Sequence, residues 1–375
     1  MKRRDLIGVG VFLVAAAGVL LLPQLPWVSD FRSQQFAYVG IYFVALLGLN
    51  LLTGITGQIS LGHGAFMLIG GYTTAILMSE QDPPLELLGH QFTGDMRDIW
   101  TIPLAGLVAG VAGFLFGFPA LRLTGLYLAL ATFAVAVAAP AVVKKYEGFT
   151  GGGGGINLFE AGTRTKATSI TDPVTFEEKR IPISILGIDI PTFNEWLYYL
   201  CWTIALVMFA AAWLLLRGRF GRSLRAVRDS ELAAASSGVN LARYKTLAFG
   251  ISAFYAGVAG ALWTYYLKIA NYEHFTLVTS VQYLAMIIIG GLGSVLGSVF
   301  GAVFITMLPI VLVYVVEGMA GVFGFKYAVI ADFLANLRLI IFGGLIILFL
   351  AIEPEGLYRM WGNVKRYFRL WPFSY

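Results

Sequence analysis

Charged residues are scarce in this chain. Only 13% of its 375 residues are Asp, Glu, Lys or Arg, whereas 58% are hydrophobic. A soluble domain carries about 25% charged residues, so this composition excludes an ordinary water-soluble protein. The apolar residues form uncharged runs, and about 20 such residues are enough to cross a bilayer as a helix. The sequence therefore predicts an all-α polytopic membrane protein that is embedded in the lipid bilayer.

Cysteine is almost missing and nucleotide-binding motifs are absent. Cys201 is the single cysteine, which excludes an intrachain disulfide and a thiolate metal cluster. No Gly-x-x-x-x-Gly-Lys-Ser/Thr motif occurs, and the glycine run in Thr150–Gly155 is not followed by the Gly-Lys-Ser/Thr that a phosphate-binding loop needs. We expect neither a cofactor nor a metal, and ATP that drives this protein would be hydrolysed by another chain.

Acidic residues are absent from the expected spans, and His63 is the one histidine inside a span. A membrane enzyme with His63 as general base would need a second titratable group within reach. The other histidines, His90 and His274, fall in expected outer loops. The chain is therefore not expected to be an enzyme.

The basic residues gather beside the apolar runs. The densest group lies at 217–245, between Trp196–Leu216 and Thr246–Leu267, and holds seven Lys or Arg against two acids. In a polytopic protein, an excess of Lys and Arg in a loop marks the cytoplasmic side. The same reasoning explains the net charge of +5 without a nucleic-acid partner. We expect a helical cytoplasmic loop that can dock on another protein.

The apolar runs predict about ten transmembrane helices. Both termini are expected in the cytoplasm, because Lys2, Arg3 and Arg4 precede the first run and a basic tail follows the last. The first run is interpreted as an uncleaved span rather than a signal peptide, because it continues past Ala15–Ala17. The expected spans are Leu6–Leu22, two helices within 33–79, Thr101–Phe118, Gly125–Val143, Trp196–Leu216, Thr246–Leu267, about 279–296, about 297–316 and Asn336–Ile352.

Four segments are expected outside, namely the acidic loop Glu80–Trp100, a long insert at 144–195, the short turn Lys268–Phe275 and the loop Glu317–Asp332. Within the insert, Arg180–Ile190 predicts a short strand pair or an irregular lid. Small residues at fixed spacing in the fourth expected span predict a face that lets another helix approach closely. These residues are Gly106, Gly110, Gly113 and Gly117.

Glycine-rich breaks interrupt two of the uncharged stretches. The first lies at Thr53–Gln58, and the second at Gly290–Ser294 with a further break at Gly297–Ser298. Irregular backbone at membrane depth is tolerated only where it is buried in protein or lines a cavity. Paired interruptions in two halves of a chain point to a central pathway built from an internal repeat. A re-entrant hairpin between Asn50 and Tyr72 would alter the span count.

Polar side chains accompany both breaks. An amide or imidazole inside a span is a candidate for function, although hydrogen bonding between helices is the alternative role for each residue alone. Their clustering beside a broken helix makes a substrate pathway an equal alternative. The candidates for this pathway are Asn50, Gln58, Ser60, His63 and Gln282.

Three blocks resemble one family, the branched-chain amino acid permeases of the LivM type. The first is Gly48–Tyr72, the second runs from the basic loop at Gly221 to Trp263, and the third is Ile289–Gly301 with its GGLGS sequence. They lie in the same order as in the family, and the resemblance covers most of residues 36–352. The long insert at 144–195 is larger than the family leads us to expect.

The resemblance implies a permease subunit of an ABC importer in the bacterial inner membrane. It implies one transmembrane permease domain over 1–375, with cytoplasmic ATPase subunits, a second homologous permease chain and a periplasmic substrate-binding protein as partners. The loop at 217–245 would couple to the ATPase, although its arginines could instead contact lipid phosphates. The implied coupling residues are Arg222, Arg225, Arg228, Glu231, Ala233, Ala234 and Gly238, which match the family's Glu-Ala-Ala-then-Gly pattern with one extra residue after the glutamate.

Two alternatives differ in substrate or driving force. Urea and short-amide permeases of the same family look very similar, so a neutral amide is an alternative to a branched-chain amino acid. An ion-driven secondary transporter also uses broken helices, but it would need intramembrane acids for its ion site. The uncharged pathway favours a neutral or zwitterionic solute.

Overall fold

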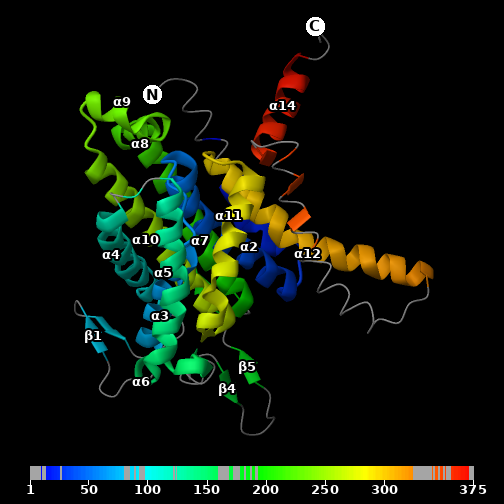
Figure 1. Ribbon diagram of the computed structural model, residues 1–375. Helices are drawn as coiled ribbons and strands as arrows, with labels where there is room; N and C mark the ends of the chain where they lie inside the picture. The colour runs from blue at the N-terminus through cyan, green and yellow to red at the C-terminus, as the bar shows by residue number, and fades with distance from the viewer. Residues whose placement is uncertain are drawn as a thin grey trace.

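The computed structural model describes most of the chain. The described residues are 10, 14–25, 28–79, 85–87, 90–92, 98–120, 123, 125–158, 169–171, 178–180, 183–185, 188–190, 193–323, 340, 343–344, 347–348, 351 and 356–370. This part is predominantly helical (Figure 1). The expected span Asn336–Ile352 lies largely outside it. Of the expected span Leu6–Leu22, it describes chiefly a short apolar helix at Val14–Gln24, which ends in the 3-10 turn η1, Leu22–Gln24.

Five of the described helices are long and apolar enough to cross a membrane. They are α2 (Asp30–Leu49) with its π-helical extension η2 (Asn50–Ile55), α4 (Thr101–Ala120), α5 (Leu126–Lys145), α7 (Phe193–Arg217) and α10 (Leu241–Leu267). A bent pair, α11 (Leu277–Gly290) and α12 (Val295–Phe323), makes a sixth span if it is counted as one. The prediction of a polytopic membrane protein is confirmed.

The first predicted break separates α2 and η2 from α3, which covers His63–Met78. At a rise of 1.5 Å per residue, the 16 residues of α3 extend about 24 Å. The hydrocarbon core of a bilayer is about 30 Å thick. Since α3 is this short, the two spans predicted within 33–79 are one full-length helix and one shorter helix.

The second predicted break is confirmed at Gly291–Ser294, where the chain bends by 116° between α11 and α12. Gly291 and Gly293 have φ values of 122° and 78°, which side chains rarely allow, so this bend depends on glycine. The further break predicted at Gly297–Ser298 is wrong, because α12 runs through it. A Cβ on Gly297 would lie 2.5 Å from the Gly291 carbonyl oxygen, so this glycine allows close packing within a continuous helix.

Helix α10 lies at the centre of the helical part and packs against α2, α3 and α4. The predicted small-residue face on α4 is confirmed as a face toward α10. A Cβ added to Gly113 would collide with the Cβ of Ala253, and one on Gly110 would come within 3.2 Å of the Phe254 Cβ. The glycines thus let two membrane helices touch along their backbones.

Short β-pairs qualify the all-α prediction. Each is two-stranded and antiparallel. The strands are β1 (Leu85–Leu87) with β2 (His90–Phe92), β3 (Ile156–Asn157) with β8 (Ile269–Ala270), β4 (Ser169–Thr171) with β5 (Glu178–Arg180), and β6 (Ile183–Ile185) with β7 (Ile188–Ile190). The last pair confirms the strand pair predicted within Arg180–Ile190. Short helical turns join the remaining loops, namely α6 (Glu147–Thr150), η3 (Gly152–Gly154) and η5 (Tyr272–Phe275).

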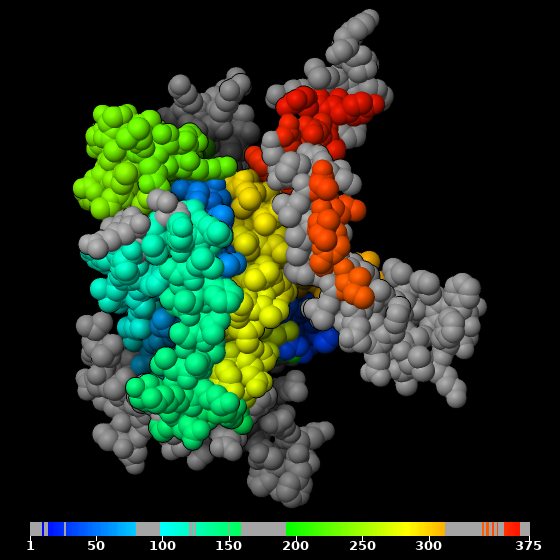
Figure 2. All heavy atoms as spheres, in the orientation of Figure 1, coloured from blue at the N-terminus to red at the C-terminus, as the bar shows by residue number. Residues whose placement is uncertain are grey.

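The polar elements separate into two ends. Helices α8 (Arg219–Asp229), α9 (Glu231–Ser236) and α14 (Gly356–Leu370) lie at one end, and α6, β1 and β4–β5 lie at the other (Figure 1). In Figure 2, α8 and α9 form a yellow-green knob at the first end. The basic loop and the predicted outer loops are therefore on opposite ends of the helices.

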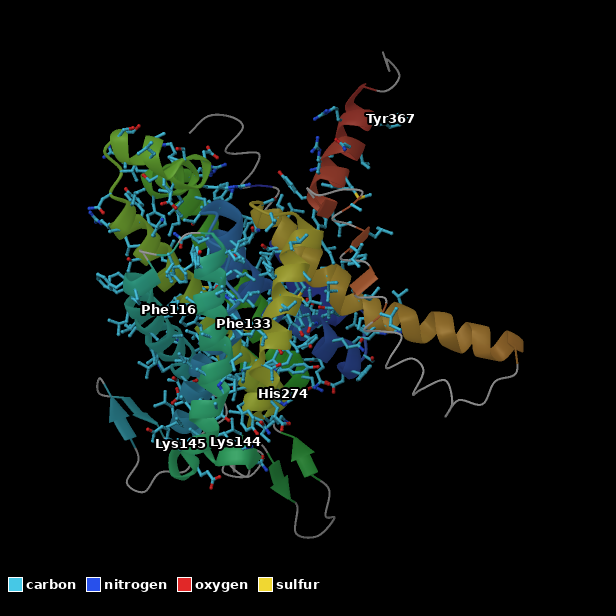
Figure 3. The ribbon with its side chains drawn as sticks, in the orientation of Figure 1. Phe116, Phe133, Lys144, Lys145, His274 and Tyr367 are labelled. Carbon is cyan, nitrogen blue, oxygen red and sulfur yellow. The ribbon has the colours of Figure 1, made fainter. Side chains whose placement is uncertain are left out.

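Between these ends, α4 and α5 present an apolar surface. Leu115 on α4 and Leu126 on α5 are 61% and 73% exposed. Phe133 lies midway along α5, while Lys144 and Lys145 mark its far end near His274 (Figure 3). An exposed apolar face of this kind suits lipid or another membrane chain.

Candidate functional site

The basic loop folds into two short helices joined by a cap. Ser230 ends α8 and begins α9, where its Oγ accepts a hydrogen bond from the Ala233 N–H at 3.3 Å. Helix α9 ends at Gly238, whose φ of 82° lies in the left-handed region. The N–H of Gly238 bonds to the Ala235 carbonyl and that of Val239 bonds to the Ala234 carbonyl, both at 3.0 Å. This pair of bonds is a Schellman motif, which strongly favours glycine at that position.

Helix α9 is attached to the body of the protein on one side only. Ala234 is buried, whereas Ala233 is exposed, so the two predicted alanines lie on different sides of the helix. Glu231 forms an ion pair of 2.6 Å with Lys245 at the start of α10. Leu232, between these predicted residues, is 84% exposed. The Glu-Ala-Ala pattern did not single out Leu232, although an apolar residue in a polar loop was the available signal.

The three predicted arginines of α8 have different surroundings. Arg228 donates a hydrogen bond of 2.6 Å from Nη1 to the Gly54 carbonyl in η2. Arg225 donates from Nη2 to the carbonyl of Leu216, at the end of α7, at 3.0 Å. Arg222 is exposed on the outer surface of α8. Arg228 therefore joins the basic loop to the first glycine-rich break, which the sequence did not indicate.

Asn50 joins the first break to the second. Its Nδ2 donates to the Ser294 carbonyl at 2.6 Å and to Ser298 Oγ at 3.0 Å. Its Oδ1 accepts from the Gly293 N–H at 2.7 Å. The two breaks lie about 240 residues apart in sequence but are bridged by this one buried side chain. Asn50 thus forms a hydrogen-bond bridge between η2 and the bend that joins α11 to α12.

The irregular backbone of η2 is stabilised by Thr53, which lies within it, and by Thr56, which directly follows it. Thr56 Oγ1 donates to the Leu51 carbonyl at 2.9 Å, and Thr53 Oγ1 donates to the Gln58 carbonyl at 3.1 Å. Gly57, with a φ of 77°, then turns the chain away. Side-chain hydroxyls therefore replace part of the regular helical bonding where the helix unwinds.

The other predicted pathway residues occupy separate places. His63 is buried and donates from Nε2 to the Ala45 carbonyl at 2.9 Å, with its ring centroid 6.1 Å from that of Tyr283. The Oγ of Ser60 accepts from the Gly62 N–H at 3.3 Å. Gln282 is half-buried on α11. Gln58 and Asn50 line two different cavities.

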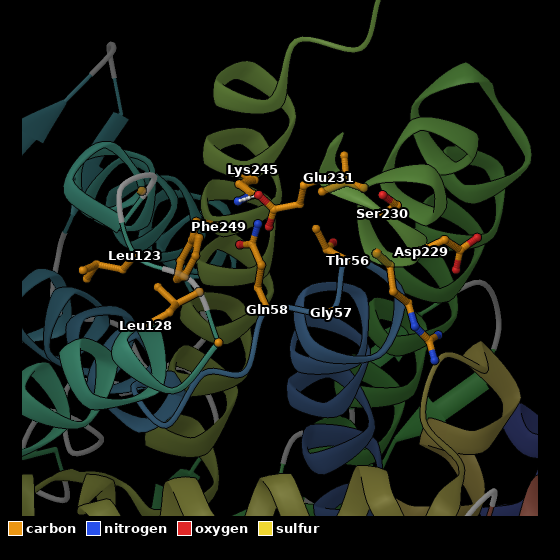
Figure 4. A pocket seen from close by; sticks show the side chains of 14 residues that line it. Thr56, Gly57, Gln58, Leu123, Leu128, Asp229, Ser230, Glu231, Lys245 and Phe249 are labelled. Carbon is orange, nitrogen blue, oxygen red and sulfur yellow. Dashed lines mark ion pairs between the residues drawn. The ribbon is translucent and has the colours of Figure 1, made fainter. Parts of the chain in front are cut away.

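Gln58 faces a cavity of about 280 Å³ behind α8 and α9. Its amide is buried, and neither its nitrogen nor its oxygen has a hydrogen-bond partner among the described residues. In Figure 4 the Gln58 side chain points toward the Glu231–Lys245 ion pair. Phe249 and Leu128 supply apolar walls. The cavity therefore combines polar groups of both charges with apolar surface at the end of the helices.

Comparison with known proteins gives a family assignment. The model of the family described as branched-chain amino acid transport system / permease component matches residues 32–350. The high-affinity branched-chain amino acid transport system permease proteins LivM of Salmonella typhimurium and Escherichia coli are each 31% identical to the chain. The matches cover 85% of this chain and 68% of each relative. No solved structure matches significantly. The chain belongs to the family of branched-chain amino acid transport system permease components.

Proposed function

We propose that this chain is the membrane-spanning permease subunit of a bacterial ABC importer that carries branched-chain amino acids across the inner membrane. The family match over residues 32–350 carries this proposal, and the relatives named for branched-chain amino acid transport support it. The chain contains no P-loop, so separate ATPase subunits would supply the energy. A second homologous permease chain and a periplasmic binding protein would complete the importer.

The proposed topology has about ten spans and both termini in the cytoplasm. The basic helices α8 and α14 occupy one end together with α9, which suits the cytoplasmic side by the positive-inside rule. The whole chain, 1–375, would form one permease domain, with an outer insert at 144–195 and a coupling loop at 217–245. The exposed apolar faces of α4 and α5 would contact lipid or the second permease chain.

Helix α9 is the proposed contact for the ATPase. It protrudes from the helical body, and Leu232 stands 84% exposed at its surface with Ala233 beside it. A leucine without apolar cover in a basic loop suits insertion into a groove of a partner protein. The Schellman turn at Gly238 and the Glu231–Lys245 pair would hold α9 in position. Arg222, which is exposed on α8, would supply charge complementarity at this contact.

The proposed pathway runs between the two glycine-rich breaks. Gln58, with its unpartnered amide, would line its cytoplasmic end, and Gln282 would line it from α11. Ser60 and His63, near the start of α3, would contribute polar groups between them. Acidic side chains are absent from the expected spans, which suits a neutral or zwitterionic solute and disfavours an ion-driven carrier.

Reconstituted transport distinguishes a branched-chain amino acid from a short amide. The chain, its partner permease, the ATPases and the binding protein are placed in proteoliposomes, and uptake of labelled leucine is followed with and without ATP. We expect uptake that requires ATP, is reduced by unlabelled isoleucine and is unaffected by excess urea. Uptake of urea in place of leucine would assign the chain to the amide permeases. Uptake that follows an ion gradient without ATP would contradict the importer.

A further inference from the structure

Two sets of hydrogen bonds, with the short helix η2 between them, join the coupling loop to the bend between α11 and α12. Arg228 on α8 binds the Gly54 carbonyl at 2.6 Å. Gly54 belongs to η2, the same six-residue π-helix that begins with Asn50. The Asn50 side chain then binds Gly293 and Ser294 at 2.7 and 2.6 Å. Three segments that are distant in sequence therefore meet through two polar side chains.

The contact between these segments is close as well as polar. A Cβ on Gly293 would lie 2.9 Å from Arg228 Nη1 and 3.0 Å from the Gly54 carbonyl oxygen. The glycine at 293 thus lets the guanidinium and both breaks meet at one point. Because packed backbone segments resist compression, a displacement of η2 is passed on to the bend rather than absorbed.

One side of α8 and α9 lies beside open space. The cavity of about 280 Å³ separates Val227–Glu231 from Leu123, Gly125 and Leu128 at the turn between α4 and α5. On its other side, α8 packs Leu224 into a buried cluster with Leu216, and the contacts of Arg228 with Gly54 and of Glu231 with Lys245 hold the loop at its polar positions. Movement of α8 into the cavity would change the Arg228 contact directly.

We propose that Arg228 and Asn50 are positioning residues that transmit the displacement of α8 and α9 to the bend at Gly291–Ser294. This inference rests on the proposed docking of α9 on the ATPase. A shift of α8 moves the Gly54 carbonyl, η2 carries the shift to Asn50, and the Asn50 amide moves the backbone of Gly293 and Ser294. The bend thereby opens or closes the pathway in step with ATP hydrolysis.

The chemistry of each side chain fits this role. The Asn50 amide donates to the Ser294 carbonyl and accepts from the Gly293 N–H at the same time, which neither a carboxylate nor an apolar side chain can do. The Arg228 guanidinium remains protonated and presents several donors in a fixed plane, so it can follow a carbonyl that moves. Asn50→Leu and Arg228→Met therefore break the series at two different places.

The test uses the reconstituted importer and measures leucine transported per ATP hydrolysed. Arg219→Met is the matched control, because Arg219 is an exposed arginine on the same helix. We expect Arg228→Met and Asn50→Leu to bind the ATPase normally and hydrolyse ATP, while transport per ATP falls by roughly 2- to 30-fold. Because the two residues act in series, the double variant should lose no more transport per ATP than the more impaired of the two single variants.

Several results would overturn the proposal. They are unchanged transport per ATP in both single variants, fully additive losses in the double variant, and loss of ATPase binding in Arg228→Met. If Arg228→Met or Asn50→Leu fails to fold, Arg228→Ala or Asn50→Asp takes its place, and unchanged coupling in these also contradicts the link. A wild-type complex that does not couple transport to ATP would instead refute the proposed function.

Discussion

One residue in the loop at 217–245, Gly238, is held in a conformation that few side chains allow. Gly238 combines a φ of 82° with two hydrogen bonds of the Schellman motif, and Ser230 caps the other end of α9. Lys245 is buried but paired with Glu231, so its charge is compensated. A six-residue helix has little stability of its own, and these few contacts therefore define its position.

Replacing Gly238 by Ala tests whether these contacts fix the position of α9. A Cβ meets no atom at this position, so the left-handed backbone alone is strained, by about 1 kcal/mol. We expect Gly238→Ala to lower ATP-driven uptake while the membrane helices keep their thermal stability. Gly218→Ala is the matched control, because Gly218 starts α8 with a φ of −75° and a Cβ there has no contact closer than 3.5 Å. Equal uptake in both variants would show that the shape of the α9 terminus does not matter.

Local signals in the sequence were enough to place the polar residues of the loop and both breaks. The density of Lys and Arg indicates a cytoplasmic loop at 217–245, and glycine runs indicate where η2 and α11 end. Both signals depend only on residues close together in sequence. The contact of Arg228 with Gly54 joins residues 174 positions apart, and periodicity cannot reveal such a pair. The break predicted at Gly297 was wrong because a glycine that allows close helix packing cannot be told by sequence from one that forms a turn.

Among the elements, α4, α3 and α10 are held together by glycine faces. Gly113 of α4 meets Ala253 of α10, and Gly70 of α3 meets the backbone of Gly257. Since lipid competes equally for apolar side chains, such close approach supplies much of the attraction between membrane helices. The sequence predicted the face on α4 from its spacing but could not identify α10 as its partner.

Enlarging one of these glycines should separate the helices. Gly113→Leu would force its side chain into Ala253, and such overpacking costs about 1–3 kcal/mol or more. We expect a lower yield of folded protein and a lower unfolding temperature in detergent. Val111→Leu enlarges an exposed residue of the same helix and should change neither quantity. A Gly113→Leu protein as stable as Val111→Leu would contradict the packing of α4 on α10.

For the whole molecule, the two ends carry different tasks in the proposed importer. The basic end offers α9 and its exposed Leu232 to an ATPase, and the other end carries the β-pairs of the outer loops. The sides of α4 and α5 are apolar, as a bilayer requires. Sequence patterning anticipated this division, because charge and hydropathy act on whole segments. It could not assign a role to the insert at 144–195, where neither family resemblance nor long apolar runs give guidance.

The most direct test of the account is the identity of what co-purifies with the chain. Tagged protein is recovered from mildly solubilised membranes as wild type, as Leu232→Asp and as Val111→Asn, a control on the exposed face of α4. The account predicts an ATPase and a second apolar chain with wild type and Val111→Asn, and loss of the ATPase alone with Leu232→Asp. A homo-oligomer without an ATPase, which transports solute into liposomes that lack ATP, would contradict it.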